Sequence, residues 1–173
     1  LVLPSDHLID DETAFRARIL NAHQAVTSTH LHATFGIRPT KAETGYGYIQ
    51  LGEKIERNEN CHYVQAFVEK PDLEKAQAYV AQGDYLWNSG IFLFNAQTLC
   101  AEIQDLEPEI HHACSDAIEH ASQDLAFIRP QAEAFQKAPS ISIDYAIMER
   151  TKSALVIPCS YNWSDVGSWS AIW

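Results

Sequence analysis

Residues 63–94 read YVQAFVEKPDLEKAQAYVAQGDYLWNSGIFLF, and this stretch decides the fold class. Small or β-branched residues alternate with larger ones over 63–68, a pattern typical of a β-strand, and Pro71 ends it. The run 91–94 is wholly apolar, which predicts a strand buried on both faces. The two strands are too far apart in sequence for a tight hairpin.

The segment between these strands predicts a helix. Asp72 can cap its first turn, and Gly83 can end it in the left-handed conformation. The apolar residues of its inner face are Leu73, Ala76 and Val80. A strand, a helix and a second buried strand in succession indicate an α/β fold.

The same alternation continues in both directions along the chain. Towards the N-terminus we expect a helix that begins after Asp10 or Asp11, and strands at 31–35 and 48–51. Towards the C-terminus we expect helices over 107–122 and 124–137, a short helix from Ser142 or Asp144 to Glu149, and a strand at 154–158. These elements predict one α/β domain, or part of one, over residues 1–173, with a mostly parallel or mixed sheet flanked by helices.

Composition narrows the class of protein. Hydrophobic residues make up 46% of the 173 residues, which excludes a disordered chain. Twelve basic and 23 acidic residues give a net charge of −11, so the sequence offers no basic face for nucleic acid. An acidic protein that handles phosphates must therefore use a few placed cations or a metal ion.

The cysteines and the apolar runs indicate the compartment. Four cysteines are far apart and form no CxxC pair, so we expect the reduced thiols of a cytoplasmic protein. No apolar run approaches the roughly 20 residues of a membrane span, so we expect no membrane partner. The chain begins at Leu1 with what resembles the end of a buried strand and ends as abruptly at Trp173, and we expect a fragment of a longer enzyme.

Five loops at strand ends could carry chemistry, because ligands of α/β sheets bind there. They are 4–7, 44–48, 67–71, 87–90 and 163–169. In them, Asp6 could hold a metal, Glu69 and Asn88 could bind sugar hydroxyls, and Lys70 could bind a phosphate. Each loop taken alone is equally well or better explained as a turn, a helix entry or a surface ion pair.

Taken together and in order, the motifs of these loops resemble those of a known family. The motifs are PSDH (4–7), GIRPT (36–40), ETGYGYI (43–49), FVEKP (67–71), NSGIF (88–92), SIDYAIME (142–149) and WSDVGSW (163–169). The set is similar to the sugar-1-phosphate nucleotidyltransferase family, and within it to the bacterial branch that uses GTP and mannose-1-phosphate. The resemblance implies a Rossmann-like fold and transfer of a guanylyl group, giving GDP-mannose and pyrophosphate.

The resemblance also implies a role for particular residues. Asp6 and Asp165 would hold Mg²⁺, and these two carboxylates with Lys70 would be the catalytic residues. Lys70 would contact the phosphate of mannose-1-phosphate. The residues implied at the sugar are Gly47 through its backbone, Glu69, Asn88 and Asp144.

One departure from the family limits these expectations. The family's N-terminal glycine-rich loop, which cradles the GTP phosphates, does not occur in the sequence, so we expect the chain alone to be inactive. Two alternatives stay open: a nucleotidyltransferase for another hexose-1-phosphate or base, and a non-catalytic module that binds a sugar phosphate. A sheet edge left uncovered by missing strands would favour a homodimer.

Overall fold

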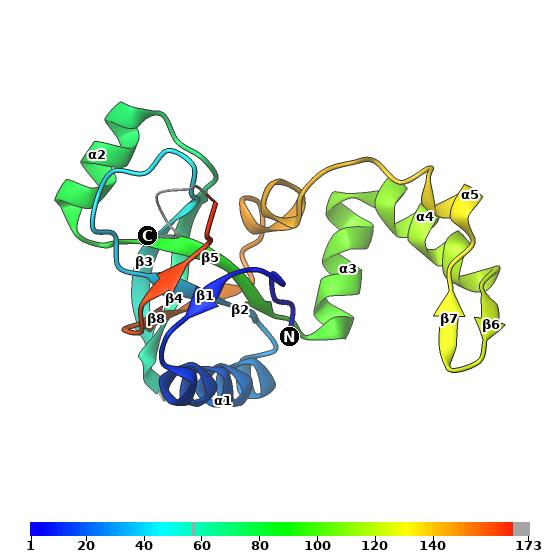
Figure 1. The fold of residues 1–173 in the computed structure, drawn as a ribbon, viewed down its shortest axis with the longest axis horizontal. Helices are drawn as coiled ribbons and strands as arrows, with labels where there is room; N and C mark the ends of the chain where they lie inside the picture. The colour runs from blue at the N-terminus through cyan, green and yellow to red at the C-terminus, as the bar shows by residue number, and fades with distance from the viewer. Residues whose placement is uncertain (57, 168–173) are drawn as a thin grey trace. The chain divides into compact units, whose positions relative to one another are not determined.

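The computed structural model describes residues 1–56 and 58–167, without the side chains of residues 58 and 59. The chain packs as two compact units, one formed by Leu1–Asn95 with Lys152–Trp173 and the other by Ala96–Thr151. Figure 1 shows the elements of both units. The interpretation of residues 1–173 as part of a single domain stays a prediction.

The first unit is built on a sheet whose strands are β2 (His32–Ile37), β3 (Tyr48–Ile55), β4 (Asn58–Val68), β5 (Tyr85–Leu93) and β8 (Ala154–Cys159). They connect in a closed ring in the order β2, β5, β3, β4 and β8. The sheet is mixed, as expected, but among the described strands only β2 and β8 pair in parallel. The parallel share is smaller than predicted because short connections, such as the one between β3 and β4, allow only antiparallel neighbours.

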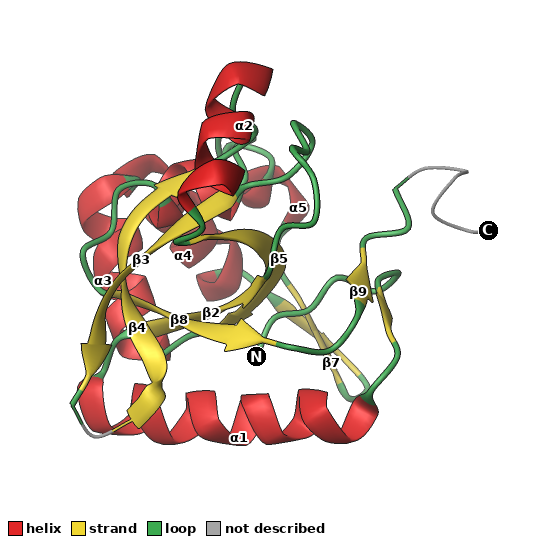
Figure 2. Cartoon of the chain, turned by 90° about the vertical axis from the view of Figure 1, so that its left-hand side faces the viewer, coloured by secondary structure: helices red, strands yellow, loops and turns green. Residues whose placement is uncertain are grey.

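Two helices of this unit begin where the sequence predicts, and the second also ends where it predicts. In α1 (Glu12–Thr29) and α2 (Leu73–Gln82), the capping carboxylates of Asp11 and Asp72 each accept a backbone N–H at 2.9 Å. Gly83 ends α2 with a φ of 79°. α1 lies along one side of the sheet (Figure 2) and buries Ala22, Ala25 and Val26. Within the described residues, no helix is both long and apolar enough to cross a membrane.

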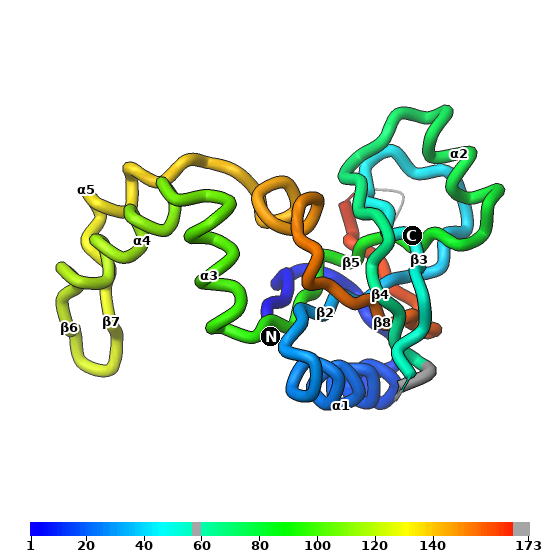
Figure 3. Tube along the Cα trace, turned by 180° about the vertical axis from the view of Figure 1, so that it is seen from behind, coloured from blue at the N-terminus to red at the C-terminus, as the bar shows by residue number. Residues whose placement is uncertain are grey.

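The second unit agrees with its prediction only in part. It contains α3 (Ala96–Leu106), α4 (Pro108–Glu119), α5 (Ala132–Phe135) and the short π-helix η1 (Asp144–Met148). The expected helix over 124–137 is wrong: β6 (Ser122–Asp124) and β7 (Phe127–Arg129) form a hairpin, visible in Figure 3, and only α5 follows. Leu125 turns the chain with a φ of 54°, and Pro130 lacks the N–H that a helix running through it would need.

The four cysteines carry free thiols, as expected. Burial raises the pKa of Cys61 and of Cys159 to about 11, so both thiols stay protonated near neutral pH. A protonated, buried thiol is a poor nucleophile and a poor metal ligand. These two cysteines therefore contribute packing rather than chemistry.

Candidate active site

Three residues from separate motifs meet at one end of the sheet. Gly47 precedes β3, Asn88 lies in β5, and Glu69 directly follows β4. The N–H of Asn88 donates to the carbonyl oxygen of Gly47 at 2.8 Å. A Cβ added at Gly47 would clash with Oε2 of Glu69 and would lie 3.1 Å from Cβ of Asn88. Glycine therefore leaves just enough room for the carboxylate and the amide side by side.

The side chains of Glu69 and Lys70 lie next to each other because strand β4 ends before these two residues. β4 stops at Val68, and Lys70 adopts a left-handed backbone with a φ of 47°. This turn brings Nζ of Lys70 to 3.2 Å from Oε1 of Glu69, although strand neighbours would point to opposite faces. The side chain of Glu69 is 9% exposed and that of Lys70 is 57% exposed. The carboxylate is thus packed in place while the ammonium reaches solvent.

Asn88 is held from two directions. Its Oδ1 accepts the N–H of Gly90 at 3.1 Å and the hydroxyl of Thr34 at 3.4 Å, and the residue is 9% exposed. Gly90 itself has a φ of 70°, and a Cβ there would lie 3.6 Å from Pro4 and 3.8 Å from His7. The loop that contains Asp6 therefore packs against β5 at Gly90.

A short ladder brings the two predicted metal-binding loops together. β1 (Leu8–Ile9) pairs antiparallel with β9 (Trp163–Ser164), and Leu8 lies opposite Ser164. Asp6 precedes β1 and Asp165 follows β9, so both carboxylates emerge at the same end of this ladder. The indole N–H of Trp163 donates to Nδ1 of His7 at 3.2 Å, which joins the two loops a second time.

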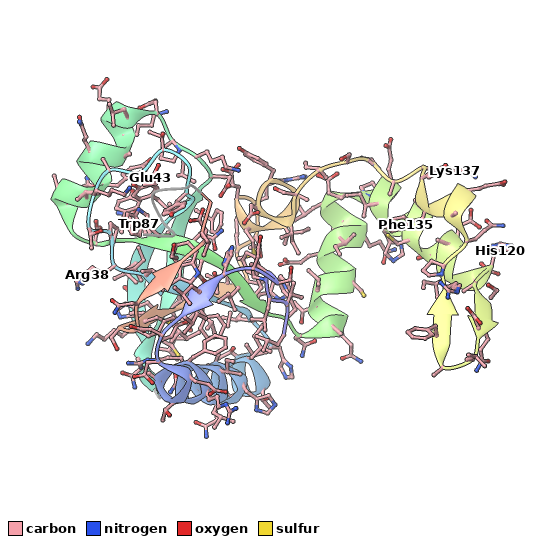
Figure 4. All side chains as sticks on the ribbon, viewed as in Figure 1. Arg38, Glu43, Trp87, His120, Phe135 and Lys137 are labelled. Atoms are coloured by element: carbon pink, nitrogen blue, oxygen red, sulfur yellow. The ribbon has the colours of Figure 1, made fainter. Side chains whose placement is uncertain are left out.

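Asp165 is contacted by a residue to which the sequence assigned no role. The hydroxyl of Tyr46 donates to Oδ1 of Asp165 at 2.8 Å, and the N–H of Gly167 donates to the same oxygen at 3.2 Å. Burial, reinforced by this carboxylate, raises the pKa of Tyr46 above its ordinary value of 10. The ring meets Trp87, labelled in Figure 4, and Trp163 edge-on, with centroids 5.2 and 5.3 Å away. The sequence feature that could have drawn attention to Tyr46 is its position between two glycines, Gly45 and Gly47.

The donor set of the two loops suits a hard divalent cation. Asp6 is exposed and Asp165 is half-buried, and the hydrogen bonds from Tyr46 and Gly167 both fall on Oδ1 of Asp165. Across residues 1–56 and 58–167, no group of three or more His, Cys, Asp or Glu residues is placed to hold a metal. Two carboxylates without a full protein cage fit Mg²⁺, which takes its remaining ligands from water and substrate phosphates.

An open pocket of about 540 Å³ adjoins the aromatic residues. Its walls are Ile37–Thr40, Trp87 and Cys159–Trp163. Arg38 brings an exposed cation to this wall. The pocket and the Tyr46 contacts thus share Trp87 and Trp163.

Two parts of the predicted motifs are not placed relative to this group of residues. Asp144 begins η1 in the second unit, so the group described above contains residues of the first unit only. Ser168 and Trp169, which close the WSDVGSW motif, lie outside the described residues. The structure brings together Gly47, Glu69, Lys70 and Asn88, and separately brings the loops of Asp6 and Asp165 side by side.

Comparison with known proteins shows the family of this chain. A family model described as nucleotidyl transferase matches residues 1–173. The mannose-1-phosphate guanylyltransferase RfbM of Salmonella typhimurium is 51% identical over 173 residues, which is 100% of this chain and 36% of that protein. The xanthan biosynthesis protein XanB of Xanthomonas campestris pv. campestris is 49% identical over 172 residues, covering 99% of this chain and 36% of that protein.

A solved structure is similar as well. A crystal structure described as a mannose-1-phosphate geranyltransferase from Thermus thermophilus superposes with a TM-score of 0.85 at 34% identity. The match covers 98% of this chain and 47% of that one. The expected α/β fold is thereby confirmed. The chain spans about a third of the length of the two sequence relatives named above.

Proposed function

Since the chain belongs to the nucleotidyl transferase family, we propose that the full-length protein transfers a guanylyl group from GTP to mannose-1-phosphate, releasing pyrophosphate. The name of the Salmonella relative supports this choice of sugar and base. The name of the Xanthomonas relative supports a place in polysaccharide biosynthesis. These names describe the whole relatives, so the proposed activity is that of the full-length protein.

The observation that carries the proposal is the meeting of Gly47, Glu69 and Asn88, with Lys70 at the exposed rim. A buried carboxylate accepts hydrogen bonds from sugar hydroxyls, and a fixed amide can both donate and accept. A lysine beside them supplies a point charge for the phosphate of the same sugar. The group therefore fits a hexose-1-phosphate, with hydroxyls on the buried side and phosphate towards solvent.

The chemistry is an in-line displacement at phosphorus. An oxygen of mannose-1-phosphate forms a bond to the α-phosphorus of GTP, and the bond from that phosphorus to the β-bridging oxygen breaks, releasing pyrophosphate. Both reactants are anions, so the residues must align them and reduce their repulsion. Lys70 would do this for the sugar phosphate.

Asp6 and Asp165 would hold Mg²⁺. The ion would neutralise charge on the phosphates and orient them. The two carboxylates would fix its position at the end of the β1–β9 ladder. Asp144 would lie towards the sugar, as its motif implies.

The cytoplasmic location and the homodimer belong to the same proposal. Four free thiols support a reducing compartment. The hairpin of the second unit exposes Leu125, Phe127 and Ile128 by 88, 65 and 71%, and such apolar residues favour association. Sedimentation of the full-length protein over a range of concentrations tests the dimer.

Product analysis tests the activity. The full-length protein is incubated with Mg²⁺, GTP and mannose-1-phosphate, and GDP-mannose and pyrophosphate are quantified. Parallel reactions replace mannose-1-phosphate by glucose-1-phosphate, or GTP by UTP. Faster turnover of either replacement would favour the alternative sugar or base. Calorimetric binding of mannose-1-phosphate without turnover of any pair would favour a non-catalytic module.

A further inference from the structure

We infer that Tyr46 is a positioning residue: it orients Asp165, and through Asp165 it sets the Mg²⁺ dependence of nucleotide-sugar binding. The inference rests on the proposed function, because it takes Asp165 as a ligand of the metal. Tyr46 itself contacts neither the metal nor the substrates in this scheme. Its hydroxyl, its ring and its backbone each make separate contacts that hold it in place.

The hydroxyl of Tyr46 bonds to one particular oxygen of Asp165, Oδ1. Tyr46 and the N–H of Gly167 both donate to Oδ1, at 2.8 and 3.2 Å. Two donors on one oxygen restrain rotation of the carboxylate, and neither of these two donors bonds to Oδ2. Ligands of a metal that are held by such an outer hydrogen bond bind it more tightly, because less freedom is lost on binding.

The ring fixes where the hydroxyl lies. Tyr46 is packed edge-on between Trp87 and Trp163, and Trp87 is 6% exposed. Edge-on aromatic contacts stabilise a packed ring by more than the area that they bury, so these two contacts hold the ring of Tyr46 in place. The hydroxyl therefore meets Asp165 from a fixed direction, although the two residues lie 119 positions apart in sequence.

The backbone and the second loop complete the frame. Gly47, next in sequence, is hydrogen-bonded to Asn88 in β5, so the chain at Tyr46 is tied to the sheet. Trp163, which contacts the ring of Tyr46, also donates to His7 beside Asp6. Tyr46 thus packs on the residue that joins the loops of both predicted metal ligands.

Tyr46→Phe in the full-length protein tests the inference, because it removes the hydroxyl and keeps the ring. GDP-mannose is titrated calorimetrically at increasing Mg²⁺ concentrations, and the concentration that gives half of the maximal affinity gain is compared with wild type. We expect this concentration to rise by about 10- to 100-fold, the range seen when an outer partner of a metal ligand is removed. At saturating Mg²⁺, kcat should recover and the KM for mannose-1-phosphate should match wild type.

A double substitution separates positioning from simple packing. In the background of Asp165→Asn, adding Tyr46→Phe should leave the remaining Mg²⁺ dependence unchanged, because the tyrosine acts only through that carboxylate. Tyr85→Phe is the matched control, since Tyr85 is a buried tyrosine at the start of β5 whose ring stacks on Tyr79. It should leave the titration unaltered.

Each other outcome overturns a defined statement. An unchanged Mg²⁺ dependence in Tyr46→Phe overturns the inference alone. A raised KM for mannose-1-phosphate at every Mg²⁺ concentration makes Tyr46 a substrate contact and also overturns it. If wild type shows no Mg²⁺-dependent binding of GDP-mannose, the proposed function fails and the inference fails with it.

Discussion

The candidate site has two halves that are built in different ways: the proposed sugar half, which is Gly47, Glu69 and Asn88, and the proposed metal half, which is Asp6 and Asp165. Gly47 precedes β3, Glu69 follows β4 and Asn88 lies within β5, and the side chains of Glu69 and Asn88 both pack against Gly47. Asp6 and Asp165 lie in loops joined by a ladder of two residue pairs and by a few side-chain contacts. The sugar half is therefore formed by the folding of the sheet itself, whereas the metal half depends on individual contacts outside it.

This contrast predicts different failures in each half. A substitution in the sugar half should disturb the fold together with binding, because the same atoms serve both. A substitution in the metal half should leave the fold intact and remove only chemistry. Three experiments test this division.

The largest effect is expected from Asp165→Asn in the full-length protein. The amide keeps the shape of the side chain and an acceptor for Tyr46 but loses the negative charge that a cation needs. Turnover should fall by about 10²- to 10³-fold, the usual cost of one group that stabilises charge in the transition state. Steady-state kinetics measure the loss, and thermal unfolding should match wild type.

A charge-matched control accompanies this variant. Asp105→Asn removes the same charge from an exposed position in α3 and should change neither quantity. Near-normal turnover of Asp165→Asn in Mg²⁺ would remove Asp165 from the ligand set. A large loss of stability would contradict the division between the two halves.

Lys70→Ala should have the next largest effect. A charge-assisted hydrogen bond contributes about 1.5–3 kcal/mol, so the affinity for mannose-1-phosphate should fall by about 10- to 100-fold. Calorimetry should show that GTP binding changes far less, since Lys70 lies beside the residues assigned to the sugar. Lys75→Ala, an exposed lysine on α2, should leave both affinities as they are. Equal losses for both substrates would reject the assignment of Lys70.

Gly47→Ala tests whether the sugar half is part of the core. The added methyl group would collide with Glu69 and crowd Asn88, so the free energy of unfolding should fall by about 1–3 kcal/mol, with sugar-phosphate affinity falling too. Denaturant unfolding measures the first quantity and calorimetry the second. Gly45→Ala is the control, because a Cβ there lies 3.5 Å from Glu43 in an ordinary contact. Equal stability of the two variants would show that the sugar half has room to adjust.

Local signals in the sequence predicted the elements that depend on local physics. Asp72 and Gly83 mark the two ends of α2, and the sequence predicts both because capping involves residues within one turn of the helix end. The helix predicted over 124–137 is wrong because its apolar spacing does not reveal the turn at Leu125, and because Pro130 prevents a helix from running through this segment. Spacing likewise predicted too many parallel strand pairs, since a strand's direction depends on the path of its connections.

The site was predictable as a set of motifs but not as a geometry. Resemblance named Glu69, Asn88 and Gly47, and the structure adds that they share one small volume. Tyr46 received no role because its partner, Asp165, lies far along the chain and belongs to another motif. Contacts between distant loops depend on the register of β1 with β9, which no local pattern encodes.

The backbone of Lys70 sets stability against activity at one position. A lysine with a φ of 47° bears the strain of the left-handed region, which a glycine would relieve by about 1 kcal/mol. Glycine would also delete the ammonium group beside Glu69. A library selected only for resistance to heat should therefore enrich Lys70→Gly and discard activity, whereas selection for GDP-mannose synthesis should restore the lysine.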